Sequence, residues 1–194
     1  VKDWADLNRR TADISPYRAL VHKYLDEERF FASPVDFGLM TARFPSLQPV
    51  EVRKQDIAPG YLPQWILASS ACFPMFPMCE IDGQNYLDGA YSDNLPISTA
   101  FRLGADRVIA IGLKPETPEK KYANHPLVTY IAPAEPLGKL LEFDTDAMRH
   151  SIALGYTDTL RVLGSHIGHT YTFEPDGKTL LDGVARDYLL WLLR

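Results

Sequence analysis

The first candidates for acid–base chemistry in this sequence are aspartates that precede glycine. Asp-Gly pairs begin at positions 82, 88, 176 and 182. Most such pairs form turns and nothing more, because aspartate bonds its own backbone and glycine tolerates a positive φ. Asp88 is the best placed, since it follows an extendable run and precedes an expected helix, with Asp93 and Asn94 close by. Open α/β sheets place ligands at strand ends, so Asp88 has the position best suited to chemistry, with a turn role as the alternative.

Other reactive side chains give weaker patterns. The chain has no G-x-S-x-G pentapeptide to present a nucleophilic serine and no adjacent glycines to build an oxyanion loop, although five histidines leave a Ser-His-Asp triad open. His166 and His169 have no cysteine or acidic ligand at metal spacing, so we expect surface or capping roles. Cys72 and Cys79 fit no common zinc pattern, and we interpret both as ordinary apolar side chains. The sequence therefore predicts no metal and no cofactor.

Composition and charge narrow the class of protein. A length of 194 residues, with 46% hydrophobic and 23% charged residues, is typical of a soluble globular domain or most of a larger one. The net charge of -5 argues against a nucleic-acid partner and against a polybasic membrane anchor. Only two cysteines indicate a reducing compartment. We expect a cytoplasmic protein, with transient peripheral contact at membranes left open.

The elements that must position these residues alternate between helices and strands. Apolar spacing and capping signals predict helices at 16–25, 61–69, 93–103, 144–163 and 184–193. In the first of these, Ser15 is the expected N-cap and Pro16 lies in the first turn. Extendable runs predict strands at 34–44, 49–54, 107–113 and 127–131, and hairpins over 78–87 and 170–181. The polar segments 3–10 and 26–29 are expected to be irregular and solvated. No repeat or linker interrupts the pattern, so we expect one domain over residues 1–194.

The region around Asp88 carries the most specific local signals. Asp82-Gly83 between two extendable runs is the strongest short-range hairpin signal. The apolar loop before it contains Phe73, Met75, Phe76 and Met78, a cluster more typical of a core than of a lipid pocket. After the next helix, the β-branched run 107–113 is typical of a strand covered on both faces, as in a parallel sheet.

Several short motifs together resemble one family. They are Ala68-Ser-Ser-Ala71, Phe73-Pro-Met-Phe-Pro77, Glu80-Ile-Asp-Gly83, Tyr86-Leu-Asp-Gly-Ala90, Asp93-Asn-Leu-Pro96 and Leu103-Gly-Ala105. In this order they look like the second half of a patatin-like phospholipase. The resemblance covers about residues 10–113, and residues 114–194 look like a C-terminal extension.

The resemblance implies a three-layer α/β/α fold and a lipid acyl hydrolase, a phospholipase or esterase acting on lipid or acyl-ester substrates. The family uses a Ser-Asp dyad without metal or cofactor. Asp88-Gly89-Ala90 matches its D-G-[GA] motif, so Asp88 would orient and deprotonate the serine. The family's elbow serine and glycine-rich oxyanion loop normally precede this region, and neither is in this sequence. We therefore expect an incomplete fold that carries the aspartate half of the site, with the serine on a missing N-terminal segment of the same protein.

The competing hypothesis is a non-catalytic lipid-binding or regulatory module that keeps Asp88 only as a structural turn. A G-x-S-x-G and a glycine-rich loop in the upstream reading frame would favour the enzyme.

Overall fold

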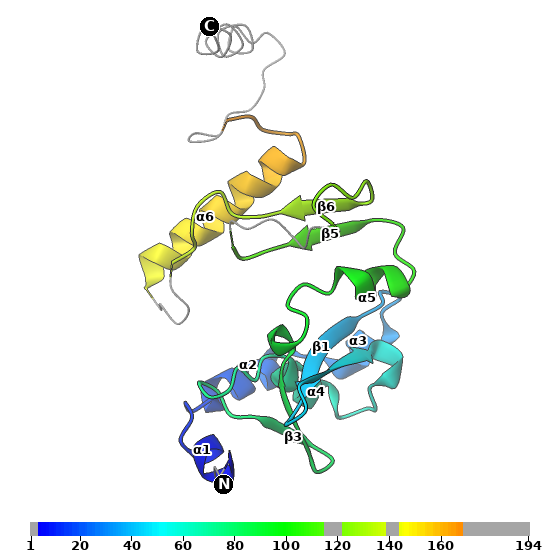
Figure 1. The fold of residues 1–194 in the computed structure, drawn as a ribbon, viewed down its shortest axis with the longest axis vertical. Coiled ribbons are helices and arrows are strands. Elements are labelled where there is room, and N and C mark those ends of the chain that lie inside the picture. Colours follow the sequence, from blue (N-terminus) through cyan, green and yellow to red (C-terminus); the bar gives the residue numbers. More distant parts are fainter. Residues whose placement is uncertain (1–3, 115–121, 139–143, 169–194) are drawn as a thin grey trace, which may run out of the picture. The chain divides into compact units, whose positions relative to one another are not determined.

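The chain contains both helices and strands and separates into two compact units. The computed structural model describes residues 4–114, 122–138 and 144–168. The units are Val1–Ala100 and Phe101–Arg194, and each is described by itself (Figure 1). The expected α/β class is confirmed, whereas the three-layer arrangement and the single domain stay predictions. Among the described residues, no helix is both long and apolar enough to cross a membrane.

A four-stranded sheet organises the first unit. Its strands are β1 (Gly38–Arg43), β2 (Gln48–Arg53), β3 (Cys79–Ile81) and β4 (Gln84–Asp88). Their order is β2-β1-β4-β3, and every neighbouring pair is antiparallel. The hairpin predicted over 78–87 is confirmed as β3–β4, and the predicted strands at 34–44 and 49–54 pair as a second hairpin, β1–β2. The sequence did not predict that the hairpins join through β1 and β4, which places Thr41 opposite both Val50 and Asp88.

Helices precede, separate and follow these strands along the chain. They are α1 (Trp4–Arg9), α2 (Ser15–Tyr24), α3 (Glu27–Ala32), α4 (Leu62–Ser69) and α5 (Ile97–Arg102), with short 3-10 turns η1 (Lys54–Asp56) and η2 (Gly89–Tyr91). The predicted helices at α2, α4 and α5 are confirmed. Ser15 does not cap α2, because Asp13 accepts hydrogen bonds from both the backbone nitrogen and the hydroxyl of Ser15. Pro16 lies in the first turn of α2, as expected.

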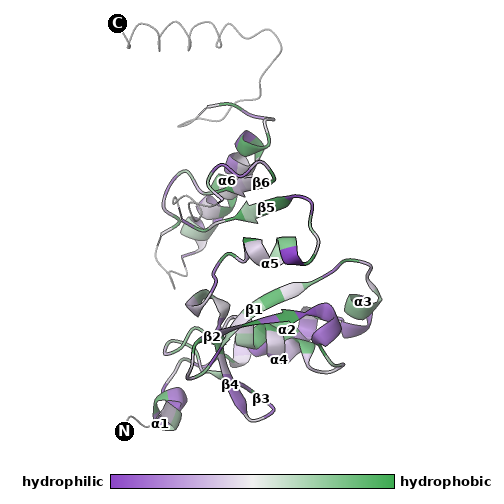
Figure 2. Ribbon diagram, turned by 45° about the vertical axis from the view of Figure 1, so that its right-hand side comes forward, coloured by the Kyte–Doolittle hydropathy of each residue, from purple (hydrophilic) through white to green (hydrophobic). Residues whose placement is uncertain are grey.

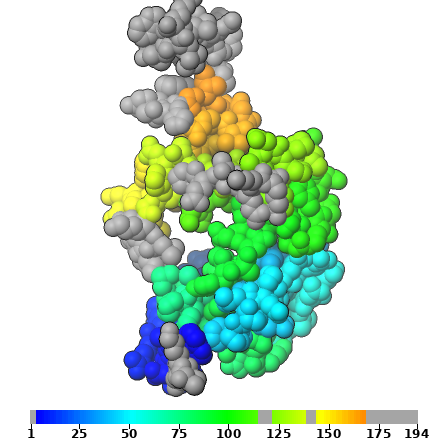
Figure 3. Space-filling model, in the orientation of Figure 1, coloured from blue at the N-terminus to red at the C-terminus, as the bar shows by residue number. Residues whose placement is uncertain are grey.

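The prediction of an irregular segment at 3–10 is wrong, because α1 forms there. Asp6 pairs with Arg10 at 2.9 Å, one helical turn away. Trp4 makes edge contacts with the rings of Phe44 and Phe73, at centroid distances of 5.4 and 6.3 Å. Figure 3 shows α1, in dark blue, at the surface of its unit. Tertiary contact of one tryptophan thus holds a helix whose polar composition gave no apolar face.

The segment 26–29 was also predicted wrongly, because it begins α3. Asp26 is the N-cap, and its carboxylate accepts a hydrogen bond from the backbone nitrogen of Arg29 at 3.0 Å. The carboxylate of Glu27 accepts hydrogen bonds from the backbone nitrogens of Gly60, at 2.8 Å, and Leu62, at 3.0 Å. These acidic residues therefore satisfy backbone donors at the N-termini of two helices, α3 and α4.

The core of the first unit lies between α4 and the sheet. Leu62 is fully buried against Leu39 and Val52. Further along α4, Ala68 packs in a cluster with Ile81 and Tyr86 of the β3–β4 hairpin. The tip of the β3–β4 hairpin is hydrophilic (Figure 2). The hairpin therefore packs its apolar residues against α4 and leaves its turn in solvent.

The second unit contains a two-stranded parallel sheet and a long helix. Its elements are β5 (Val108–Ile111), β6 (Val128–Ile131) and α6 (Thr145–Val162), all three predicted from the sequence. Asp144 caps α6 by accepting from the backbone nitrogen of Ala147 at 2.7 Å. Ile109 and Ile111 are 60% and 63% exposed, so the expected burial of both faces of β5 is wrong in the described part of the chain.

A charged residue, and not its largest apolar residues, lies on the inward face of α6. Met148 and Ile152 are both exposed. Asp158 is buried instead, and its carboxylate accepts from the backbone nitrogen of Ala134 at 2.8 Å and from Arg161 at 2.7 Å. A polar anchor thus orients the helix. The hairpin expected over 170–181 and the helix expected at 184–193 lie outside the described residues.

Candidate active site

Asp88 is the last residue of β4 and the N-cap of η2. Its backbone nitrogen donates to the carbonyl of Ala71 at 3.0 Å. Its Oδ1 accepts from the backbone nitrogen of Ala90 at 2.8 Å. Among the described residues, Oδ2 has no hydrogen-bond partner. The carboxylate is therefore anchored through one oxygen, at the end of a strand, and its second oxygen can accept a proton donor.

Gly89 lets the backbone after Asp88 lie directly on β1. A Cβ at Gly89 would come within 2.7 Å of the carbonyl carbon of Met40 and still closer to its oxygen. The φ of Gly89 is not positive, so the glycine is required for close approach and not for the left-handed conformation that Asp-Gly turns suggest. The sequence identified the residue, but only the structure gives the reason for it.

Polar side chains follow Asp88 closely in the chain. The hydroxyl of Tyr91 donates to the carbonyl of Phe73. Burial raises the pKa of Tyr91 above its usual value, and Cys72 and the negative charge of Asp88 add to that increase. Asp93 accepts from the backbone nitrogen of Leu95 at 3.1 Å through Oδ1, as Asp88 accepts from Ala90. Tyr91 is the neighbour that the sequence did not point to, and its position directly after Asp88-Gly89-Ala90 was the available signal.

Asp82 lies at the other end of β4 from Asp88. It has a φ of 51° and Gly83 a φ of 77°, as in a two-residue hairpin turn with positive φ at both positions. Its carboxylate accepts from the hydroxyl of Tyr61 at 3.0 Å, and this hydrogen bond raises the pKa of Tyr61. Asp82 and Asp88 are six positions apart, which corresponds to at most about 20 Å of extended chain. The hairpin therefore keeps Asp82 away from any chemistry at Asp88.

The serines near this region are bonded to backbone carbonyls. Ser69 donates to Met40 at 2.8 Å, Ser70 to Ile66 at 3.1 Å, and Ser92 to Gly89 at 3.1 Å. In the part of the chain that the structure describes, no serine hydroxyl is hydrogen-bonded to Asp88. Each of these hydroxyls stabilises a turn or a helix end, and none is arranged as a nucleophile with a base.

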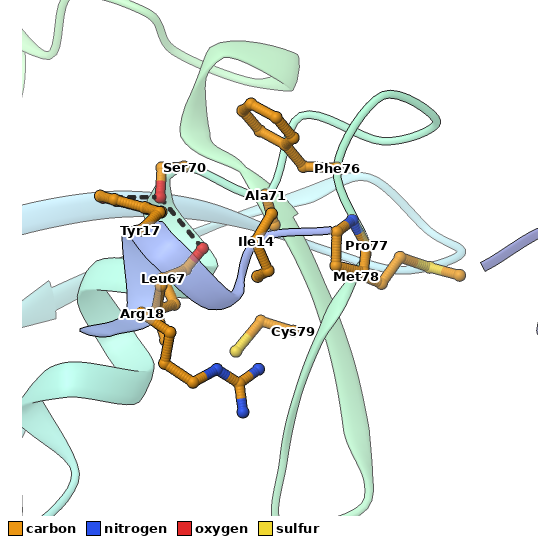
Figure 4. Close-up of a pocket in the computed structure, with 10 residues that line it drawn as sticks. All are labelled: Ile14, Tyr17, Arg18, Leu67, Ser70, Ala71, Phe76, Pro77, Met78 and Cys79. Carbon is orange, nitrogen blue, oxygen red and sulfur yellow. Dashed lines mark hydrogen bonds between the residues drawn. The ribbon is translucent and has the colours of Figure 1, made fainter. Parts of the chain in front are cut away.

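A small pocket with an accessible space of only about 20 Å³ lies between α2, α4 and the proline-rich loop. Figure 4 shows Arg18 and Cys79 along it and the hydroxyl of Ser70 joined to that of Tyr17. Its apolar lining includes Ile14, Leu67, Phe76 and Met78. Phe73 is buried in the core with Ala42 and Leu87, so the apolar cluster of the loop divides between core and pocket.

The remaining titratable residues do not assemble a metal site where they can be seen. Within the described ranges, no group of three or more histidine, cysteine or acidic side chains could hold a metal ion. Cys79 is half-buried, and burial raises its pKa although Arg18 opposes the increase. The Nδ1 atom of His166 is buried without a partner among the described residues, and His169 lies outside them.

Comparison with known proteins gives one family match. The model of the family described as patatin-like phospholipase matches residues 6–101. The match contains Asp88 and ends where the first compact unit ends, so β5 lies outside it although the resemblance was expected to extend to residue 113. No curated protein matches the chain.

Proposed function

Because residues 6–101 belong to the patatin-like phospholipase family, we propose that the full-length protein hydrolyses fatty acyl ester bonds of lipids with a Ser-Asp dyad. Asp88 supplies the base, and the serine comes from a segment outside these 194 residues, which contain no G-x-S-x-G. The observation that supports this role is the anchoring of Asp88 at a strand end with Oδ2 open to a proton donor.

In the proposed reaction, Asp88 carries out two proton transfers while the acyl group moves to the serine. The serine hydroxyl gives its proton to Asp88 as its oxygen bonds the ester carbonyl carbon. Asp88 passes that proton to the oxygen of the departing alcohol as the carbon–oxygen bond breaks, which leaves an acyl-serine. Water repeats the sequence, releasing a fatty acid and restoring both residues. A carboxylate is a weak base, so its position and hydrogen bonding must supply the basicity that histidine provides in a triad.

The 194-residue chain by itself is expected to hydrolyse a short-chain nitrophenyl ester no faster than background. Its serines near Asp88 are bonded to backbone carbonyls and none is paired with a base. Turnover that disappears after treatment with a serine-directed phosphonate would overturn this prediction. The labelled peptide, identified by mass spectrometry, would then show whether Ser69, Ser70 or Ser92 is the nucleophile.

Chelation is expected to leave hydrolysis by the full-length protein unchanged. The spacing of the cysteines and histidines in these 194 residues fits no metal pattern, and the proposed dyad needs only proton transfer. The measurement is the ester hydrolysis rate before and after dialysis against EDTA. A large loss that one metal ion restores would contradict the dyad and direct attention to His166 and His169.

A further inference from the structure

The side chain of Tyr91 reaches back from the end of η2 to the loop that follows α4. Tyr91 is the last residue of η2, and its hydroxyl donates a hydrogen bond to the carbonyl of Phe73. Partial burial raises the pKa of Tyr91, and the nearby side chains of Cys72 and Asp88 raise it further. The hydroxyl therefore lies close enough to Asp88 to interact with its charge, while its proton is directed at Phe73.

The acceptor of this hydrogen bond belongs to a fixed part of the first unit. Phe73 is buried and packs with core residues of β1 and β4. Its backbone nitrogen donates to the carbonyl of Ala71 at 2.8 Å, and the same carbonyl accepts from the backbone nitrogen of Asp88 at 3.0 Å. The segment 71–73 thus binds the backbone of Asp88 at one end of η2 and the hydroxyl of Tyr91 at the other, which closes a ring of contacts around η2.

The direction of the Asp88 carboxylate depends on where η2 lies. Its Oδ1 accepts from the backbone nitrogen of Ala90, the middle residue of η2. The first residue, Gly89, is fixed by its close approach to the backbone of β1, and the last, Tyr91, is fixed by its bond to Phe73. Loss of the Tyr91 hydroxyl would release the far end of η2, so that the Ala90 nitrogen could shift and turn the Asp88 carboxylate with it.

We propose that Tyr91 is a positioning residue for Asp88: by bonding to the carbonyl of Phe73, its hydroxyl holds η2 so that Oδ2 of Asp88 points at the proton donor. The inference rests on the proposed function and adds a residue to it, because Tyr91 acts on the base and not on the ester. Misplacing reacting groups by about 1 Å can slow a reaction about 10²-fold. Tyr91→Phe should therefore lower kcat roughly 10- to 100-fold. KM should stay unchanged, because the lost bond orients the base and does not contact substrate.

The test measures kcat and KM of the full-length protein with a soluble ester, and melting curves give the folded fraction of each variant. Tyr61→Phe is the matched control, since it also removes one tyrosine hydroxyl, the donor to Asp82 at 3.0 Å, and keeps the ring. This control should keep the parental kcat.

A second arm combines Tyr91→Phe with Asp88→Asn. If Tyr91 acts through the carboxylate, its hydroxyl has nothing to position once that carboxylate is an amide. Adding Tyr91→Phe should then leave the residual rate of Asp88→Asn nearly unchanged, because the effects of residues that act as a unit are not additive. A hydroxyl that only stabilised the fold would lower the rate in both backgrounds alike.

A parental kcat for Tyr91→Phe would overturn the positioning role, and so would an equal loss in Tyr61→Phe. An equal loss in the Asp88→Asn background would mean that Tyr91 acts independently of the base. Failure of Tyr91→Phe to fold would assign the hydroxyl to the stability of the unit and would contradict the inference as well. All of these results leave the Ser-Asp dyad standing, because the single variant Asp88→Asn tests the dyad. Near-parental hydrolysis by that variant would remove the dyad, and the role of Tyr91 with it.

Discussion

Asp88→Asn should reduce ester hydrolysis by the full-length protein about 10²- to 10⁴-fold, the effect of losing a positioned general base. The amide has almost the same shape, and its oxygen can still accept from the backbone nitrogen of Ala90, as Oδ1 does now. Folding should therefore survive, with a melting temperature within a few degrees of the parent. The measurements are a thermal melting curve and an esterase rate with a soluble substrate.

Asp82→Asn is the matched control, since Asp82 is the aspartate at the other end of the same strand. Asparagine suits a turn with positive φ, and its side-chain oxygen can accept the hydroxyl of Tyr61 that Asp82 accepts now. The sequence suggested that Asp82 needs only its own backbone, and the bond to Tyr61 corrects that view without changing the expected result of near-parental activity and stability. Near-parental hydrolysis by Asp88→Asn would contradict the dyad. Failure of Asp88→Asn to fold would make Asp88 structural and favour the non-catalytic module.

Gly89→Ala adds one methyl group and should be the most destabilising glycine-to-alanine substitution in this region. Its Cβ would lie 2.7 Å from the carbonyl carbon of Met40 and 2.8 Å from the Met40 Cβ. The obstacle is backbone of the central strand β1, which cannot rotate away as a side chain would. We expect the free energy of unfolding to fall by roughly 3 kcal/mol. Activity should fall as well, because η2 must move away from β1 and Asp88 directly precedes η2. Urea denaturation measures the change.

Gly83→Ala is the control that distinguishes the stability cost of a close contact from the stability cost of backbone strain. Gly83 has a φ of 77°, and a Cβ there would meet no atom within 4 Å. Its substitution should therefore cost only the left-handed penalty of about 1–2 kcal/mol. If Gly89→Ala proves no more costly than Gly83→Ala, the packing of η2 on β1 is not as close as described.

Local features of the chain were determined by the sequence itself. The β3–β4 turn follows from Asp82-Gly83, because a two-residue hairpin needs positive φ at both positions and these residues adopt it at low cost. The helix α4 and the long helix α6 follow from apolar spacing. Asp88 was found at a strand end because strand, turn and helix signals follow one another within a few residues.

Tertiary structure decided the features that depend on residues far apart in the chain. Pairing of β1 with β4 puts Thr41 opposite Asp88 across 47 positions of sequence, and no local pattern encodes such a partner. The same pairing places Gly89 in close contact with Met40, so this glycine is needed for close packing and not for a flexible turn. Helix α1 forms because Trp4 finds Phe44 and Phe73, and buried Asp158 turns α6 against its apolar pattern. Propensity and spacing act within a few residues, whereas burial and hydrogen-bond satisfaction are settled only when distant segments meet.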